Sequence, residues 1–212
     1  MGSIVRRLFI AFMILNLIVF GRAGRFFSRT LSMKIILYSN ELVWLLQHPP
    51  LYTAGISATD DDIVEKLFPI YKTGRGGKHT YHGPGQRIIY LMLNLKKRNK
   101  CDIKLYIRDL SKWIINVLKQ FNILGEFKED RIGIWVNHNG VEKKIAAFGI
   151  RLRKWVTYHG IALNVFPDLS HYKGIIACGL QDYGVTSMEE LGVKVPLSEL
   201  DDILKKDSSA QL

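Results

Sequence analysis

An Asn-Gly pair between two apolar runs constrains this chain more than any other feature of its sequence. Asn139 and Gly140 separate the run at residues 132–136 from the run at residues 141–148. Asparagine and glycine tolerate the positive φ angles that a tight two-residue turn requires. Two strands joined by such a turn lie antiparallel, so the sequence predicts a β-hairpin here.

Further apolar runs have the length and the residue types of strands. They lie at residues 34–38, 42–47, 87–95 and 157–166. The run at 87–95 is apolar at nearly every position, which is typical of a strand buried on both faces. The run at 42–47 stops at His48 and two prolines, because proline lacks the N–H that continues a strand ladder.

Two segments have helical patterns. Between residues 104 and 122 apolar side chains recur at three- and four-residue spacing, as in an amphipathic helix that lies on a sheet. Residues 186–190 contain overlapping capping boxes and predict a short second helix. Strands interrupted by a few helices predict an α+β fold with a mixed, largely antiparallel sheet.

The length of 212 residues fits one domain with a single core. We expect a catalytic domain at 34–206, preceded by an atypical basic and apolar segment at 1–33 and followed by a polar tail at 207–212. The largely apolar stretch from Leu8 to Phe20 is thirteen residues long, which is too short to span a bilayer, because a spanning helix takes about 20. This stretch is open to three interpretations: a shifted start of the reading frame, a membrane-associating or targeting segment, or a buried helix.

The net charge and the cysteine content limit the class of binding partner and the cellular compartment that the sequence predicts. The net charge of +11 favours an acidic partner, which includes nucleic acid, an anionic membrane surface and an acidic protein. Cys101 and Cys178 form no CxxC pair, so neither a zinc ribbon nor a disulfide framework is predicted. A reducing cytoplasm is the simplest setting.

The segment at residues 75–85 is dense in glycine and in hydrogen-bonding side chains. Glycine lets a backbone approach a ligand closely, and the arginine, threonine, tyrosine and histidine side chains supply donors. The spacing is not that of a P-loop or a dinucleotide fingerprint, so phosphate binding is not predicted. The alternative interpretation is a solvated turn between two strands.

Two lysines follow the hairpin turn. Because successive residues of a strand face opposite sides, either Lys143 or Lys144 should face inward, and the spacing does not decide which. Both could instead be solvated charges of the hairpin. His82 and His159 are candidate polar residues of a pocket, and each could equally be a core histidine with its hydrogen bonds satisfied.

Cys178 ends an apolar run and precedes a glycine, so its thiol would lie where a strand opens into a loop. It is either a small buried apolar residue or a nucleophile. A nucleophilic role requires a lowered thiol pKa, which a nearby ammonium such as that of Lys144 would provide. Cys101 lies in a polar turn without such surroundings.

Together these segments resemble the lipoyl(octanoyl) transferase family, whose fold is similar to that of the biotin and lipoate protein ligases. The matching segments follow the family's order and lie at residues 41–50, 75–77, 80–86, 144–151, 159–165, 178–179 and 184–187. The chain departs from the family in two places. Residues 1–40 do not resemble the helix-bearing segment that usually opens the family, and Ala177 stands where a proline commonly precedes the cysteine.

The resemblance implies the catalytic-domain fold of the biotin and lipoate protein ligases and an acyltransferase activity. It assigns Cys178 as the nucleophile that carries an acyl group as a thioester, and Lys144 as the residue that lowers its pKa. The implied acyl-substrate contacts are Arg75, Gly76, Gly77, Lys78, His79, Thr80, Tyr81, His82, Ala147, Phe148, Gly149, Gly160, Ile161 and Ala162.

The implied reaction is the first step of endogenous protein lipoylation. An octanoyl group moves from octanoyl-acyl carrier protein to a lysine of the apo-lipoyl domains of 2-oxoacid dehydrogenase E2 subunits and of the glycine cleavage H protein. No cofactor, metal or nucleic acid is implied. A rival ATP-dependent ligase would need a phosphate-binding Gly/Arg loop and no Cys178. A nucleic-acid-binding module would need basic residues interleaved with aromatic ones on one surface, whereas here they are dispersed.

Overall fold

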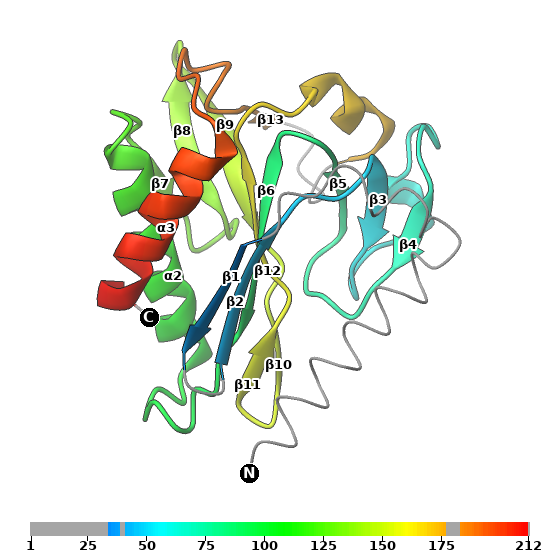
Figure 1. Cartoon of the computed structure of the whole chain (residues 1–212). Helices are drawn as coiled ribbons and strands as arrows, with labels where there is room; N and C mark the ends of the chain where they lie inside the picture. The colour runs from blue at the N-terminus through cyan, green and yellow to red at the C-terminus, as the bar shows by residue number, and fades with distance from the viewer. Residues whose placement is uncertain (1–33, 39–40, 177–182, 212) are drawn as a thin grey trace.

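The computed structural model describes residues 34–38, 41–176 and 183–211. Its centre is an eight-stranded sheet of order β1-β2-β6-β12-β9-β8-β7, with β13 paired to β9 (Figure 1). The strands are β1 (Lys34–Tyr38), β2 (Glu41–Leu46), β6 (Gln86–Met92), β7 (Glu126–Phe127), β8 (Ile134–His138), β9 (Val141–Phe148), β12 (Gly160–Asn164) and β13 (Gly184–Val185). Only the β13–β9 pair is parallel among these described strands, which confirms the mixed, largely antiparallel sheet.

Smaller elements lie beside the main sheet: a three-stranded sheet on the side that faces away from the helices, and a two-stranded hairpin at one end of the main sheet (Figure 1). A three-stranded sheet has the order β4-β3-β5, and β10 and β11 form a separate hairpin. The bounds are β3 (Leu51–Ala54), β4 (Ile70–Lys72), β5 (His79–His82), β10 (Arg151–Arg153) and β11 (Val156–Tyr158), with 3-10 turns η1 (Asp60–Asp62) and η2 (Leu169–Gly174).

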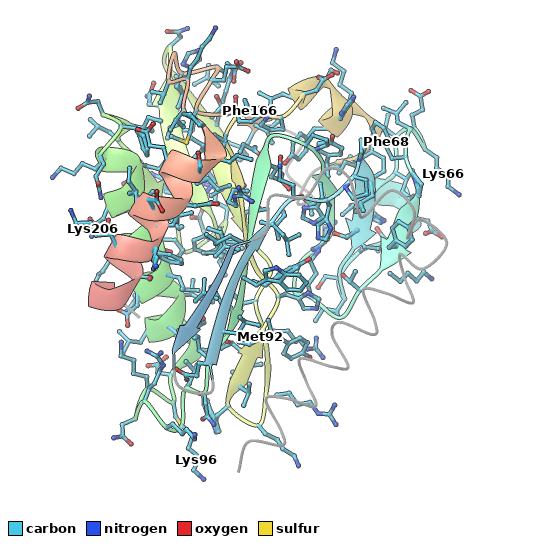
Figure 2. All side chains as sticks on the ribbon, in the orientation of Figure 1. Lys66, Phe68, Met92, Lys96, Phe166 and Lys206 are labelled. Carbon is cyan, nitrogen blue, oxygen red and sulfur yellow. The ribbon has the colours of Figure 1, made fainter. Side chains whose placement is uncertain are left out.

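Two helices cover the opposite face of the main sheet: α2 (Ile103–Lys119) and α3 (Leu197–Gln211) (Figure 1). The Asp102 side chain caps α2 by accepting from the backbone N–H groups of Lys104 and Leu105, which no earlier helical carbonyl could satisfy. The apolar stripe of α2 packs onto the sheet and forms the largest core cluster. Lys206 lies on the outer, exposed side of α3 (Figure 2).

The predicted hairpin is confirmed as β8 and β9. Asn139 and Gly140 have φ angles of 54° and 81°, the left-handed conformation for which this residue pair is favoured. The predicted helix at 104–122 is confirmed as α2, and the run at 87–95 is confirmed as the buried strand β6.

One predicted element is interrupted and one is wrong. The predicted strand at 157–166 is confirmed as β11 and β12, which are separated only by His159 with its φ angle of 60°. The chain stays hydrogen-bonded beside β6 across this interruption, since the Leu91 N–H donates to the His159 carbonyl oxygen and the Thr157 N–H donates to that of Leu93. The short helix predicted at 186–190 is only a turn. There the Glu190 carboxylate accepts from the side chains of Thr186 and Lys143, and the chain turns at Gly192 with a φ angle of 84°.

The helix α3 was not predicted, and it extends into the segment at 207–212 that the sequence predicts as a polar tail. Within the described residues, no helix has the length and apolarity that crossing a membrane would require. The predicted N-terminal segment at 1–33 lies outside the residues that the structure describes.

Candidate active site

Strands of the main sheet and of the smaller sheet line a cavity of about 490 Å³. This volume falls within the roughly 300–1,000 Å³ of typical small-molecule sites, and most of the exposed lining is apolar. All but two of the predicted site residues that the structure describes line this cavity: Arg75, Gly76, Gly77, Lys78, Thr80, His82, Lys144, Ala147, Phe148, Gly149, Gly160, Ile161 and Ala162.

His79 and Tyr81 do not line the cavity. Both belong to β5, where residues alternate between faces, so Thr80 and His82 face the cavity and their neighbours face the other way. Tyr81 packs into an aromatic cluster that includes Phe68, labelled in Figure 2, at 5.7 Å between ring centroids. The structure therefore places these two side chains behind the cavity wall.

Lys144 is the inward-facing lysine of β9. Its side chain is buried, with 6% exposure, and its Nζ donates to the carbonyl oxygen of Ile132 at 3.4 Å. Lys143 instead reaches the Glu190 carboxylate at 3.0 Å. The structure thus decides a question that strand alternation left open. Among the described residues, Lys144 forms no ion pair with a carboxylate.

Cys178 lies outside the described residues. The described chain resumes at Tyr183, and β13 then runs parallel to β9, with Val185 in register with Lys144. The backbone N–H of Thr186 also donates to the Lys144 carbonyl oxygen at 3.0 Å. The chain that follows the predicted nucleophile is therefore hydrogen-bonded beside the buried lysine.

Arg75 holds the glycine-rich segment against β3. Its Nε donates to the Thr53 hydroxyl at 2.9 Å, its Nη1 donates to the Gly76 carbonyl oxygen at 2.8 Å, and its Nη2 donates to the Thr53 carbonyl oxygen. A Cβ at Gly149 would approach the Arg75 Cδ to 3.0 Å, so glycine there leaves room for the buried guanidinium. These contacts hold the segment in place as part of the cavity lining, so it is not a solvated turn.

Three histidines contribute polar groups to the cavity. Burial lowers the pKa of His48 and of His159 to about 4, and burial followed by the nearby His48 holds the pKa of His82 well below its ordinary value. All three imidazoles are therefore uncharged at neutral pH. The His82 Nδ1 lies 2.7 Å from the Gln86 side-chain oxygen, to which it donates.

His48 and Tyr90 also line the cavity, and unlike His82 and His159 they were not predicted from the sequence. The His48 Nε2 lies 2.7 Å from the Tyr90 hydroxyl. A sequence signal for His48 was present, because it ends a buried strand immediately before two prolines within a segment that matches the family. No group of three or more His, Cys, Asp or Glu side chains that could hold a metal occurs among the described residues.

Comparison with known proteins gives the family. The model of the lipoyl protein ligase A/B catalytic domain matches residues 30–208. An octanoyltransferase of Wolbachia pipientis wMel is 96% identical over 169 residues, which are 80% of this chain and 82% of the relative. An octanoyltransferase of Ehrlichia ruminantium strain Gardel is 60% identical over 169 residues, which are 79% of this chain and 81% of the relative.

The fold agrees with these matches. A bipartite lipoate protein ligase of Thermoplasma acidophilum, solved in a study of an archaeal lipoylation system and its E2 lipoyl domain, superposes with a TM-score of 0.65. That match covers 89% of this chain and 75% of the other at 17% identity, so it supports the fold alone. With the family model covering most of its length and relatives at high identity, the chain belongs to the lipoyl protein ligase A/B catalytic domain family.

Proposed function

We propose that this protein is an octanoyltransferase, which moves an octanoyl group from octanoyl-acyl carrier protein to a lysine of a lipoyl domain. The name octanoyltransferase is that of the 96% identical relative. The observation that carries the proposal is the position of Lys144, a buried ammonium at the wall of a largely apolar cavity. Such a cavity suits a medium-chain acyl group, and the ammonium suits a reactive anion beside it.

The proposed chemistry has two steps. In the first, the Cys178 thiolate attacks the thioester carbonyl of the donor, a new C–S bond forms, and the carrier thiolate leaves and takes up a proton. In the second, the lysine amine of the acceptor attacks the acyl-enzyme, a C–N bond forms, and the Cys178 thiolate leaves while the amine loses a proton. A thioester becomes an amide, so the reaction runs downhill without ATP.

Lys144 would stabilise the Cys178 thiolate before the first attack and again when it leaves. A positive charge beside a cysteine favours the thiolate, which is the reactive form. The Lys144 ammonium is suited to this role because, among the described residues, no carboxylate lies within ion-pair distance of it. Because His48 and His159 are uncharged, an acyl chain in the cavity would not lie beside a buried imidazolium charge.

The proposed partners are acidic proteins. The net charge of +11 favours them, because complementary charge speeds protein association. The study of the Thermoplasma ligase names an E2 lipoyl domain beside the ligase, and we propose lipoyl domains of E2 subunits and of the glycine cleavage H protein as acceptors here. We propose a cytoplasmic setting, which fits the free and exposed state of Cys101.

The test is the intact mass of the purified protein after incubation with octanoyl-acyl carrier protein without ATP. We expect one octanoyl adduct that hydroxylamine removes. Cys178→Ala should abolish it and Lys144→Ala should slow its formation by about 100-fold or more. The matched controls are Cys101→Ala, which removes the other cysteine, and Lys143→Ala, which removes the neighbouring lysine, and both should behave as the wild type. A folded wild-type protein that acquires no adduct would overturn the proposal.

A further inference from the structure

The β8–β9 register places an aromatic ring beside Lys144. Ile134 pairs with Ala146 and the next residue, Trp135, pairs with Lys144, so β9 contributes one extra residue at this point. Such a bulge re-aims the side chains that follow it, and bulges are common next to active sites. Directly opposed residues of antiparallel strands carry their side chains on the same face. The bulge thus brings Trp135 and Lys144 onto one face.

Trp135 does not belong to the helix-covered core. Its neighbours Ile134 and Val136 pack into the large cluster under α2, whereas the Trp135 side chain points to the opposite face, where only 1% of it is exposed. The Lys144 Nζ lies 4.8 Å from the centroid of the Trp135 ring. At this distance the ammonium and the indole ring make a cation–π contact, and such contacts are strongest with tryptophan.

Further contacts fix the indole in place. Its Nε1 donates to the Arg131 carbonyl oxygen at 2.9 Å, and the Arg131 guanidinium carbon lies 4.7 Å from the ring centroid. Arg131 also lies 4.2 Å from the ring centroid of Tyr183, and the Tyr183 and Trp135 rings meet edge to face at 5.2 Å. The ring that contacts Lys144 is therefore held by its own N–H and by two neighbouring side chains.

Charged groups around this cluster are paired with one another. The Glu142 carboxylate binds Arg131 and also Lys128, and the exposed Asp130 lies 3.7 Å from Arg131. None of these carboxylates is within ion-pair distance of Lys144 in the part of the chain that the structure describes. A carboxylate partner would neutralise the Lys144 charge, whereas the face of a ring holds an ammonium and leaves its charge available to an anion.

We propose that Trp135 is a positioning residue for acyl transfer: the face of its indole holds the Lys144 ammonium at the cavity wall, where it stabilises the reactive thiolate. This inference rests on the proposed function and adds a residue that acts through Lys144 rather than by touching the substrate. A purely structural Trp135 would affect only stability.

The test measures the alkylation rate of Cys178 by iodoacetamide as a function of pH, in a Cys101→Ser background so that one thiol reacts. This readout needs no acyl donor. We expect Trp135→Leu to raise the pH midpoint of alkylation by about one unit and to slow octanoyl adduct formation by roughly tenfold. Trp135→Phe, which keeps a weaker aromatic face, should fall between the wild type and Trp135→Leu.

The matched control is Trp113→Phe, which alters a buried tryptophan of α2 in the helix-covered core. It should lower stability and leave the pH midpoint unchanged. A folded Trp135→Leu protein whose alkylation midpoint equals that of the wild type would overturn the inference. If Trp135→Leu does not fold, an unchanged alkylation midpoint in Trp135→Phe would overturn it instead. If the midpoint shifts but the wild type accepts no octanoyl group, the positioning role holds and the proposed function fails.

Discussion

The two faces of the main sheet are both buried, but they are filled in different ways. Strand β6 shows the contrast within four residues, because Ile89 and Leu91 point into the apolar core under α2 and α3, whereas Ile88 and Tyr90 point into the cavity. The helix face is packed with apolar side chains, apart from the buried ion pair of Arg87 and Asp201. The cavity face contains a buried lysine, a buried arginine and three uncharged histidines.

This difference separates the residues that stabilise the fold from the residues that serve the proposed reaction. Apolar burial on the helix face contributes about 25 cal/mol per Å² of area removed from water. Buried polar groups on the cavity face cost free energy unless hydrogen bonds offset the loss of water. We therefore expect substitutions on the helix face to change the free energy of unfolding, and substitutions on the cavity face to change activity more than stability.

The largest expected effect on stability belongs to the helix face. Trp113 of α2 is fully buried, and Trp113→Ala should lower the free energy of unfolding by about 3–5 kcal/mol through lost contacts and the cavity left behind. Urea titration followed by circular dichroism measures the loss.

The matched variant on the other face is Lys144→Met, which keeps the length of the side chain and removes a buried charge. It should leave the free energy of unfolding unchanged or raise it, while it slows octanoyl adduct formation. A loss of stability in Lys144→Met comparable to that in Trp113→Ala would break the contrast between the faces.

A smaller effect should come from the buried ion pair on the helix face. The Arg87 Nε lies 3.0 Å from the Asp201 carboxylate, and both side chains are at most 2% exposed. Arg87→Met should lower the free energy of unfolding by about 3 kcal/mol, because Asp201 would lose a buried partner. The control is Arg108→Met, which breaks the exposed pair with Glu129 and should cost at most about 1 kcal/mol. Equal losses in the two variants would show that burial of the pair does not matter.

The smallest effect concerns the pH dependence contributed by the cavity face. Burial lowers the pKa of His48 from its usual 6.5 to about 4, so the unfolded chain binds more protons than the folded one within this window. The free energy of unfolding should therefore fall as the pH falls from 6.5 towards 4, by on the order of 2 kcal/mol for this histidine. His48→Gln should reduce that slope, as measured by urea titrations at several pH values. An unchanged slope would contradict the buried, uncharged state of His48.

Local signals in the sequence predicted the parts of the fold that local chemistry decides. The Asn139-Gly140 turn and the periodicity of α2 specify their elements without help from distant residues. The break at His159 could not be read in the same way, because it depends on which strands β11 and β12 pair with. The helix α3 was missed because most of its residues are polar, although Leu200 and Leu204 on its inner side belong to the main core.

The candidate site was predicted largely through the resemblance to a family, and its geometry needed the structure. Composition and spacing left the inward lysine undecided, and the bulge in β9 that sets Lys144 against Trp135 has no marker in the sequence. The position of His79 and Tyr81 outside the cavity lining has a simple cause. A continuous run of residues was assigned to the site, whereas a strand presents only every second residue to one side.

The position of α3 has a consequence for synthesis of the protein on the ribosome. The main core includes Leu200 and Leu204, and Arg87 meets a partner 114 residues further along the chain. Until α3 is made, the apolar face of the sheet is therefore covered by α2 alone, and the part that α3 covers stays exposed. A nascent chain at that stage exposes apolar surface that is prone to aggregation, as incompletely synthesised domains commonly do. Dependence on chaperones should therefore be greatest just before the last helix emerges.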